Sequence, residues 1–299
     1  MITVGAGVYP GLSYDDYAAI AAVRSSDLKG FRRSALHARY AMQHPAESAT
    51  LMLGQAVHAA LLEPDKADAL YVAVPKVDGR TSAGKAAKAA FAEANQGRII
   101  LSADDYAEAL ALSDAARAHP VARELLGGDG ENELSLVWRD AETSLMCKAR
   151  LDRRTNHRGH EAIIELKTTT DAGPRGFARQ VDQFGYHMSA AWYLRGLDAL
   201  DPSPRRFIFI ALEKGEPHAV ACYELDELFL AVGRAECDRA LRAYARARAA
   251  DSWPGYPERI TTLAAPGWLS LTPEPEVVEP QVCEPASSPA PAPAVEHGS

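Results

Sequence analysis

Lys148-Ala-Arg-Leu-Asp152 and Ile163-Ile-Glu-Leu-Lys-Thr168 are the two stretches that decide the fold. Apolar residues recur through both stretches in the manner of strands, which predicts strands at 145–153 and 161–168. The polar segment 156–159 ends in glycine and predicts a tight turn between them. The sequence therefore predicts an antiparallel hairpin at this point of the chain.

Two carboxylates and one ammonium are expected to meet on this hairpin. Residues two apart in a strand face the same side, so Glu165 and Lys167 should project together, and Asp152, near the turn, can approach the same face. Mg²⁺ takes oxygen ligands and needs only one or two carboxylates beside substrate phosphate. We predict that Asp152 and Glu165 bind Mg²⁺, or Mn²⁺ in its place, while Lys167 orients or deprotonates a water or stabilises transition-state charge. A structural Glu–Lys pair on an exposed strand stays open as the alternative.

The elements around the hairpin indicate an α/β fold. Alternation predicts further strands at 133–138, 205–212 and 218–223, and helical spacing and capping residues predict helices at 13–22, 26–44, 49–62, 80–95, 102–119, 176–197 and 226–249. This order predicts a mixed central sheet flanked by helices and preceded by a helical N-terminal region. We divide the chain into an N-terminal segment 1–24, a domain 25–272 and a Pro/Ala/Glu-rich tail 273–299, which we expect to be disordered.

The net charge of −8 argues against a protein that simply coats DNA. Five of the acidic residues lie in the tail, which has no Lys or Arg, so the domain itself is only mildly acidic. The four cysteines are scattered, which predicts free thiols. We find neither a membrane-length apolar run nor a signal sequence and expect a cytoplasmic protein.

From Ser25 to Tyr223 the sequence resembles the RecE-type exonucleases of the PD-(D/E)xK superfamily. The motifs that carry the resemblance are Ser25-Ser-Asp-Leu28, Gly54-Gln-Ala-Val-His58, Glu133-Leu-Ser-Leu-Val-Trp138, Cys147-Lys-Ala-Arg-Leu-Asp152, Glu165-Leu-Lys167 and Tyr186-His-Met-Ser-Ala-Ala-Trp-Tyr193. The resemblance implies a restriction-endonuclease-like core for residues 25–272.

The resemblance also implies roles for matching residues. His58 becomes a third metal ligand beside Asp152 and Glu165, and Tyr193 joins Lys167 among the catalytic residues. From the residues alone, His58 reads as a packed helix histidine.

One position departs from the family pattern. The usual Gln before the tyrosine of the last motif is Ser189, and Gln183 lies one and a half turns earlier. Glu133 is a further acidic candidate, although a glutamate at a strand start is usually solvated.

The resemblance implies a metal-dependent exonuclease that digests linear double-stranded DNA from its ends. It implies phage or prophage recombination, a single-strand annealing partner and a homo-oligomer that encircles DNA. Phosphate contacts are expected from basic residues, namely Arg80, Lys85, Lys88, Arg175 and Arg179, with Lys76, Arg32, Arg33 and Arg39 as further candidates.

Two alternatives stay open. One is a Cas4- or AddB-like nuclease with another repair role. Such nucleases often hold an iron–sulfur cluster on four cysteines, which the scattered cysteines do not favour. The other is a catalytically inactive relative that binds DNA, suggested only by Ser189.

Overall fold

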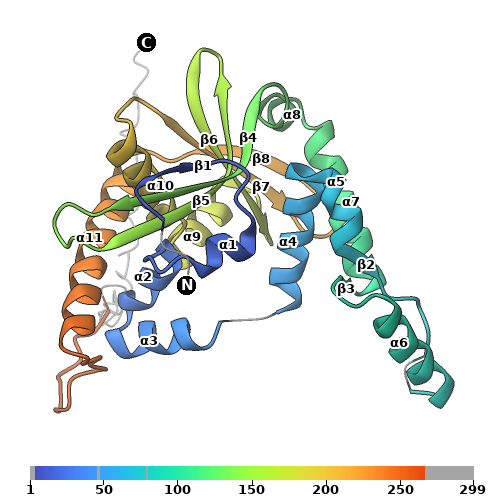
Figure 1. Cartoon of the computed structure of the whole chain (residues 1–299), viewed down its shortest axis with the longest axis horizontal. Helices are drawn as coiled ribbons and strands as arrows, with labels where there is room; N and C mark the ends of the chain where they lie inside the picture. The colour runs from blue at the N-terminus through green and yellow to red at the C-terminus, as the bar shows by residue number, and fades with distance from the viewer. Residues whose placement is uncertain (1–3, 46–47, 79, 267–299) are drawn as a thin grey trace, which may run out of the picture. The chain divides into compact units, whose positions relative to one another are not determined.

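Six strands form the central sheet of the computed structural model, which describes residues 4–45, 48–78 and 80–266. They are β1 (Gly7–Tyr9), β4 (Gly130–Arg139), β5 (Met146–His157), β6 (His160–Thr169), β7 (Arg206–Glu213) and β8 (Val220–Glu224). Their order in the sheet is β1-β4-β5-β6-β7-β8, and only β6 and β7 are parallel neighbours (Figure 1). The predicted mixed sheet and the β4–β5–β6 meander are confirmed.

Helices make up most of the remaining described chain. They are α1 (Tyr14–Ala19), α2 (Ser25–Lys29), the short 3₁₀ helix η1 (Gly30–Arg32), α3 (Ala35–Gln43), α4 (Ala49–Leu62), α5 (Pro64–Leu70), α6 (Ser82–Ala94), α7 (Ala103–Ala118), α8 (Pro120–Leu126), α9 (Pro174–Gln183), α10 (Tyr186–Leu200) and α11 (Glu227–Ala249). A small parallel pair, β2 (Tyr71–Ala73) and β3 (Ile99–Leu101), lies apart from the main sheet.

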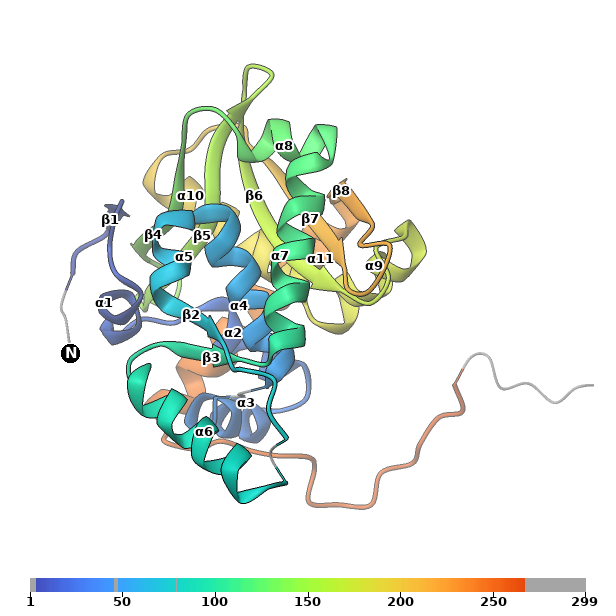
Figure 2. The same ribbon diagram turned by 90° about the vertical axis from the view of Figure 1, so that its right-hand side faces the viewer.

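The sheet has a hydrophobic core on each face. Side chains of α9, α10 and α11 pack on one face with Ile163 and Phe209, while α4, α7 and α8 pack on the other with Ile164 and Ile210 (Figure 2). Because successive strand residues point to opposite faces, β6 and β7 supply both cores alternately. Burial on both faces explains why β7 is apolar in an unbroken run from Phe207 to Leu212.

Local signals located several helices correctly. α4 has the predicted bounds, with Ser48 accepting a hydrogen bond from the Leu51 amide as its N-cap. Ser102 caps α7 in the same way, through the Asp105 amide. Pro64, which follows α4 closely, begins α5, because proline suits the first turn of a helix.

Two helices that were predicted to be continuous are broken. The predicted helix 26–44 is divided into α2, η1 and α3, and a Cβ on Gly30 would lie 2.5 Å from the Ala38 Cα, so the chain folds back closely there. The predicted helix 176–197 is divided between α9 and α10 at Gly185, whose φ of +62° is left-handed. Both predictions were wrong about continuity, and both breaks place a helix end beside the site described below.

Lys148 fastens the N-terminal segment to the sheet. This lysine is 4% exposed and donates hydrogen bonds to the carbonyls of Tyr17, Ala18 and Ile20 at the end of α1. The ammonium therefore adds hydrogen bonds to carbonyls at the C-terminal end of α1, where a cation is favourable. Lys148, although two strand positions from Arg150 and four from Asp152, serves the fold.

The chain separates into two units, residues 1–256 and 257–299. The predicted tail 273–299 lies outside the described residues. None of the described helices combines the length and apolar character needed to cross a membrane.

Candidate active site

The side chains of strand β4 change from one face of the sheet to the other at Glu133. The Asn132 side chain donates to the Leu62 carbonyl of α4, whereas Leu134, two positions along, lies in the core on the opposite face of the sheet. In a regular strand these two residues would share a face. Glu133, between them, has a φ of 53°, which is left-handed and uncommon for a residue other than glycine.

The side chains of strand β5 change faces in the same way at Asp152, the residue opposite Glu133. Arg153 donates to the Leu125 carbonyl in α8, whereas Leu151 lies in the other core. The β4–β5 pairing passes from Asn132–Arg153 to Leu134–Leu151 and skips the pair between them, Glu133 and Asp152. We call this position the joint of the sheet. Because the alternation is interrupted there, it does not decide to which face of the sheet the side chains of Glu133 and Asp152 point.

The joint is also where β5 and β6 separate. Their pairing ends at Arg153–Ile164, and beyond it Asp152 Oδ2 accepts a 2.7 Å hydrogen bond from the Leu166 amide. The expectation that Asp152 lies near the hairpin turn is wrong, because the turn is at Arg158–Gly159 and Asp152 lies at the open end of the hairpin. The separation of the strands, instead of the turn, brings this carboxylate beside the Glu165–Lys167 segment.

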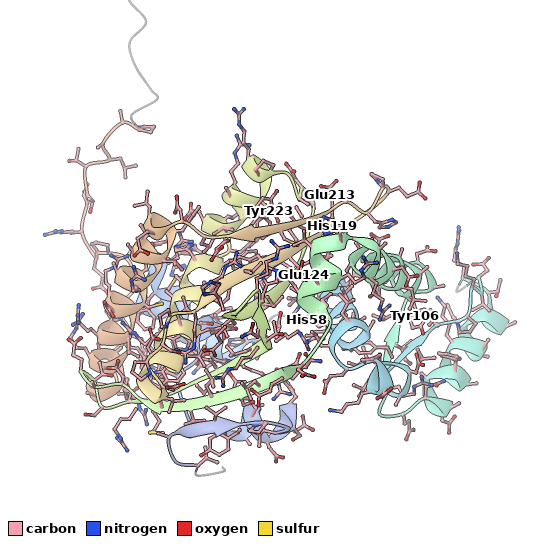
Figure 3. The ribbon with its side chains drawn as sticks, turned by 90° about the horizontal axis from the view of Figure 1, so that it is seen from above. His58, Tyr106, His119, Glu124, Glu213 and Tyr223 are labelled. Atoms are coloured by element: carbon pink, nitrogen blue, oxygen red, sulfur yellow. The ribbon has the colours of Figure 1, made fainter. Side chains whose placement is uncertain are left out.

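His58 reaches the joint from α4 (Figure 3). Its Nε2 lies 3.1 Å from the Leu166 carbonyl oxygen and its Nδ1 3.4 Å from Asp152 Oδ1. A hydrogen on Nε2 donated to that carbonyl leaves the Nδ1 lone pair directed towards the joint. Gly54, one turn before His58 on α4, faces β6: a Cβ there would make an ordinary contact of 3.6 Å with Thr168 Oγ1.

His58, Glu133 and Asp152 form a group able to hold a metal ion. One ligand atom from each lies within 4.8 Å of the others. Burial lowers the pKa of His58, but the Asp152 carboxylate outweighs burial and the net pKa is raised. Burial opposes ionisation of Asp152, yet His58, Lys167 and the Leu166 amide together hold its pKa below the usual value.

Glu165 and Lys167 lie beside this group as a buried ion pair. Lys167 Nζ donates to Glu165 Oε1 at 2.6 Å and to the Leu166 carbonyl at 3.1 Å. Burial, with the nearby charge of Asp152, raises the pKa of Glu165 to about 7, whereas the two carboxylates raise the pKa of Lys167 against its burial. The expected projection of both side chains to one side is confirmed by their contact.

The donor set fits a divalent cation. Glu165 Oε2 is buried and has no hydrogen-bond partner among the described residues, which is costly unless an ion or water satisfies it. Carboxylate oxygens suit Mg²⁺ and Mn²⁺, and an imidazole nitrogen is compatible with Mn²⁺. His58, Glu133 and Asp152 would hold the ion directly. Glu165, predicted as a ligand, is not a member of this group, and its unpaired oxygen lies on the adjacent strand β6.

Tyr193 lies within the electrostatic reach of the same carboxylates. Burial raises its pKa well above the usual value, with further contributions from Glu165 and Asp152. Ser189 is buried on α10, and the Gln183 side chain is exposed at the end of α9. The Tyr193 ring lies 6.2 Å from the Phe207 ring, and the catalytic role of this tyrosine stays a prediction.

Three residues at the site had weak or no signals in the sequence. Glu133 had the signal of an ordinary strand start, and it is paired with Arg150 at 2.6 Å. Lys29 at the end of α2 and Tyr186 at the start of α10 meet there through the two helix breaks: Lys29 Nζ lies 5.6 Å from the Tyr186 ring centroid.

The basic residues expected to contact DNA are dispersed. Arg80, Lys85 and Lys88 are exposed in and just before α6, which projects away from the sheet (Figure 1), and Arg175 and Arg179 are exposed on α9. Lys76 is paired with Asp104, Arg39 with Asp251, and Arg32 with Asp182 and Glu236. The guanidinium of Arg32 is therefore already engaged in holding α9 and α11.

Three cysteines lie in the described part of the chain, on β5, β8 and α11. Burial raises the pKa of the Cys147 and Cys237 thiols to about 12 and that of Cys222 to about 11. Thiols that stay protonated are poor metal ligands. Cys283 lies outside the described residues.

The profile of a family described as a PDDEXK-like domain of unknown function (DUF3799) matches residues 24–266. The chain belongs to this family. The matched residues include strands β4 to β8 of the sheet, both helical layers and the site, but not β1. The PD-(D/E)xK superfamily expected from the motifs is confirmed, while the narrower RecE-type assignment stays a prediction.

One solved structure supports the same fold. A putative exonuclease from Eubacterium rectale is 13% identical to this PDDEXK-like domain protein, with a TM-score of 0.52 over 78% of this chain and 86% of that one. A second structure, SSO0001, is also 13% identical over 68% of this chain and 81% of that one, with a TM-score of 0.29, which carries no argument. A search of curated proteins found no significant match. Family and fold together support a nuclease.

Proposed function

We propose that this protein is a metal-dependent exonuclease that hydrolyses phosphodiester bonds of linear double-stranded DNA. The observation that carries the proposal is the joint, where His58, Glu133 and Asp152 converge beside the Glu165–Lys167 pair. A buried structural ion pair would not require the orphaned oxygen of Glu165 or two further acidic groups next to it.

We assign a different role in the reaction to each residue at the joint. A divalent ion held by His58, Glu133 and Asp152 would polarise the phosphodiester and lower the pKa of a coordinated water. Asp152 is kept ionised mainly by His58 and Lys167 against its burial, and the Leu166 amide orients it. The Leu166 carbonyl orients His58. Lys167, fixed by two hydrogen bonds, presents its ammonium to charge developing on the phosphate. Its raised pKa favours this role over that of a base.

The exposed cations Arg80, Lys85, Lys88, Arg175 and Arg179 are proposed to contact the DNA backbone away from the metal. End resection in phage recombination, with a single-strand annealing protein and a homo-oligomer around DNA, is the setting we infer from the resemblance. Digestion from ends is the part of this setting that an assay can test first.

The test uses full-length protein, duplex DNA labelled at one end, and closed circular DNA of the same sequence. We expect Mg²⁺- or Mn²⁺-dependent release of nucleotides from the linear duplex, loss of activity with chelator, and little action on the circle. Glu165→Gln and Lys167→Ala should be inactive. Equal digestion of circles would replace the exonuclease with an endonuclease, and full activity in both variants would refute the site.

A further inference from the structure

A second ammonium group lies beside Lys167. Lys29 Nζ is 5.6 Å from the centroid of the Tyr186 ring, and Lys167 Nζ is 5.3 Å from the same centroid. The Lys29 stem is packed against the chain reversal between α9 and α10, since a Cβ on Gly185 would lie 3.5 Å from its Cδ and Cε. Two cations are therefore held around one aromatic ring at the edge of the joint.

Lys29 has no carboxylate within ion-pair distance among the described residues, unlike Lys167. Glu165 is near enough to act on it electrostatically, but its Oε1 is already bound by Lys167. Burial, reinforced by the charge of Lys167, lowers the pKa of Lys29 to about 8. A partly buried ammonium that lacks an anion is unfavourable, and an arriving anion would relieve it.

We propose that Lys29 binds a non-bridging oxygen of the phosphodiester that is being cleaved, a proposal that rests on the proposed nuclease function. A phosphodiester brought to the joint carries one negative charge into a place that holds an unpaired ammonium. Leu28, which is fully buried, anchors α2, so the lysine is presented from a fixed helix end. Lys29 would act as a substrate-binding residue in addition to the metal ligands.

A structural role makes a different prediction. If Lys29 served only to hold Tyr186 through a cation–π contact, its replacement would lower the melting temperature and leave DNA affinity unchanged. If Lys29 instead binds the phosphate, Lys29→Met removes an unpaired charge. The melting temperature should then stay unchanged or rise, while DNA binding weakens.

The experiment measures binding of a fluorescent linear duplex with 5′-hydroxyl ends to the cleavage-defective Glu165→Gln protein, at several salt concentrations. Adding Lys29→Gln should weaken binding by about tenfold or more and reduce the magnitude of the salt slope, log K against log salt, by about 0.9. Lys29→Arg should retain most of the affinity. Lys66→Gln, on the exposed Lys66–Glu63 pair of α5, is the control and should change nothing.

Cleavage by otherwise wild-type protein supplies the second readout. Lys29→Gln should lower kcat/KM by a similar factor on 5′-hydroxyl and 5′-phosphate substrates. Equal binding and cleavage by Lys29→Gln and wild type would overturn the inference, as would a loss confined to 5′-phosphorylated ends. Failure of the wild type to cleave any DNA with Mg²⁺ or Mn²⁺ would instead refute the proposed function, so the two failures are distinguishable.

Discussion

Asp152 Oδ2 accepts a 2.7 Å hydrogen bond from the backbone amide of Leu166, the residue between Glu165 and Lys167. The carboxylate takes the place of the backbone partner that β5 would have offered if the ladder had continued. Its other oxygen faces His58 Nδ1 at 3.4 Å. One side chain thus ends the strand pairing and faces the candidate metal site, which couples the geometry of the site to the fold.

Asp152→Asn separates these two roles. The amide oxygen of asparagine can still accept from Leu166, but the charge that attracts a cation is lost. We expect near-normal stability without metal, loss of Mg²⁺-dependent stabilisation, and no cleavage. Asp152→Ala removes both roles and should cost a further ~1–3 kcal/mol of unfolding free energy, because the buried Leu166 amide is left unpaired. Thermal and urea unfolding with and without Mg²⁺ measure both. A full Mg²⁺ response in Asp152→Asn would contradict the assignment.

Lys167→Met should reduce cleavage far more than DNA binding. The ammonium is placed to stabilise charge that develops during the reaction, and loss of one such donor typically costs on the order of 10²–10³ in kcat. Single-turnover cleavage, with DNA affinity measured in parallel, provides the comparison. A similar loss of affinity, with kcat unchanged, would reassign Lys167 to substrate binding.

The pH dependence of metal binding follows from Glu165. Its pKa of about 7 lies above the usual value because of burial and the neighbouring Asp152. Without metal, the folded state binds more protons than the unfolded state between those two pKa values, so stability should fall as pH rises through this window and then level off. Metal requires the carboxylate, so Mg²⁺-dependent stabilisation should rise over the same window. The raised pKa of His58 acts in the same direction.

Melting temperatures across about pH 5 to 8.5, with and without Mg²⁺, test whether metal-free stability falls while Mg²⁺-dependent stabilisation rises. Glu165→Gln cannot titrate and should flatten the metal-free profile. A metal-free protein that becomes more stable as pH rises towards neutrality would show that Glu165 does not control the response.

Local signals predicted much of the fold because they act over a few residues. Ser48 and Ser102 begin helices through hydrogen bonds to amides three positions away, and the alternation around Glu165 and Lys167 fixes which side they share. The candidate site was found largely through such patterns and a family resemblance. The order of elements then sufficed for a mixed sheet.

The remaining features depend on contacts distant in sequence. Lys29 meets Tyr186 only because the chain reverses at Gly30 and at Gly185, and helical periodicity continues through both reversals. Asp152 was expected near the hairpin turn, but it lies just beyond the last β5–β6 pair, Arg153–Ile164. The separation of the two strands at this point, where Asp152 binds the Leu166 amide, is not indicated by any residue type in the sequence.

Glu133 offers the sharpest test of the joint, because its φ of 53° is a cost that glycine does not bear. Glu133→Gly and Glu133→Ala both lose the 2.6 Å pair with Arg150 and the candidate metal ligand, so their difference isolates the backbone. We expect the glycine variant to be more stable than the alanine variant by ~1 kcal/mol, although glycine is the poorer residue in a regular strand. Urea denaturation without metal measures the difference. Greater stability of the alanine variant would mean that β4 passes through Glu133 in an ordinary extended conformation, and the explanation of how His58 and Asp152 meet would have to be abandoned.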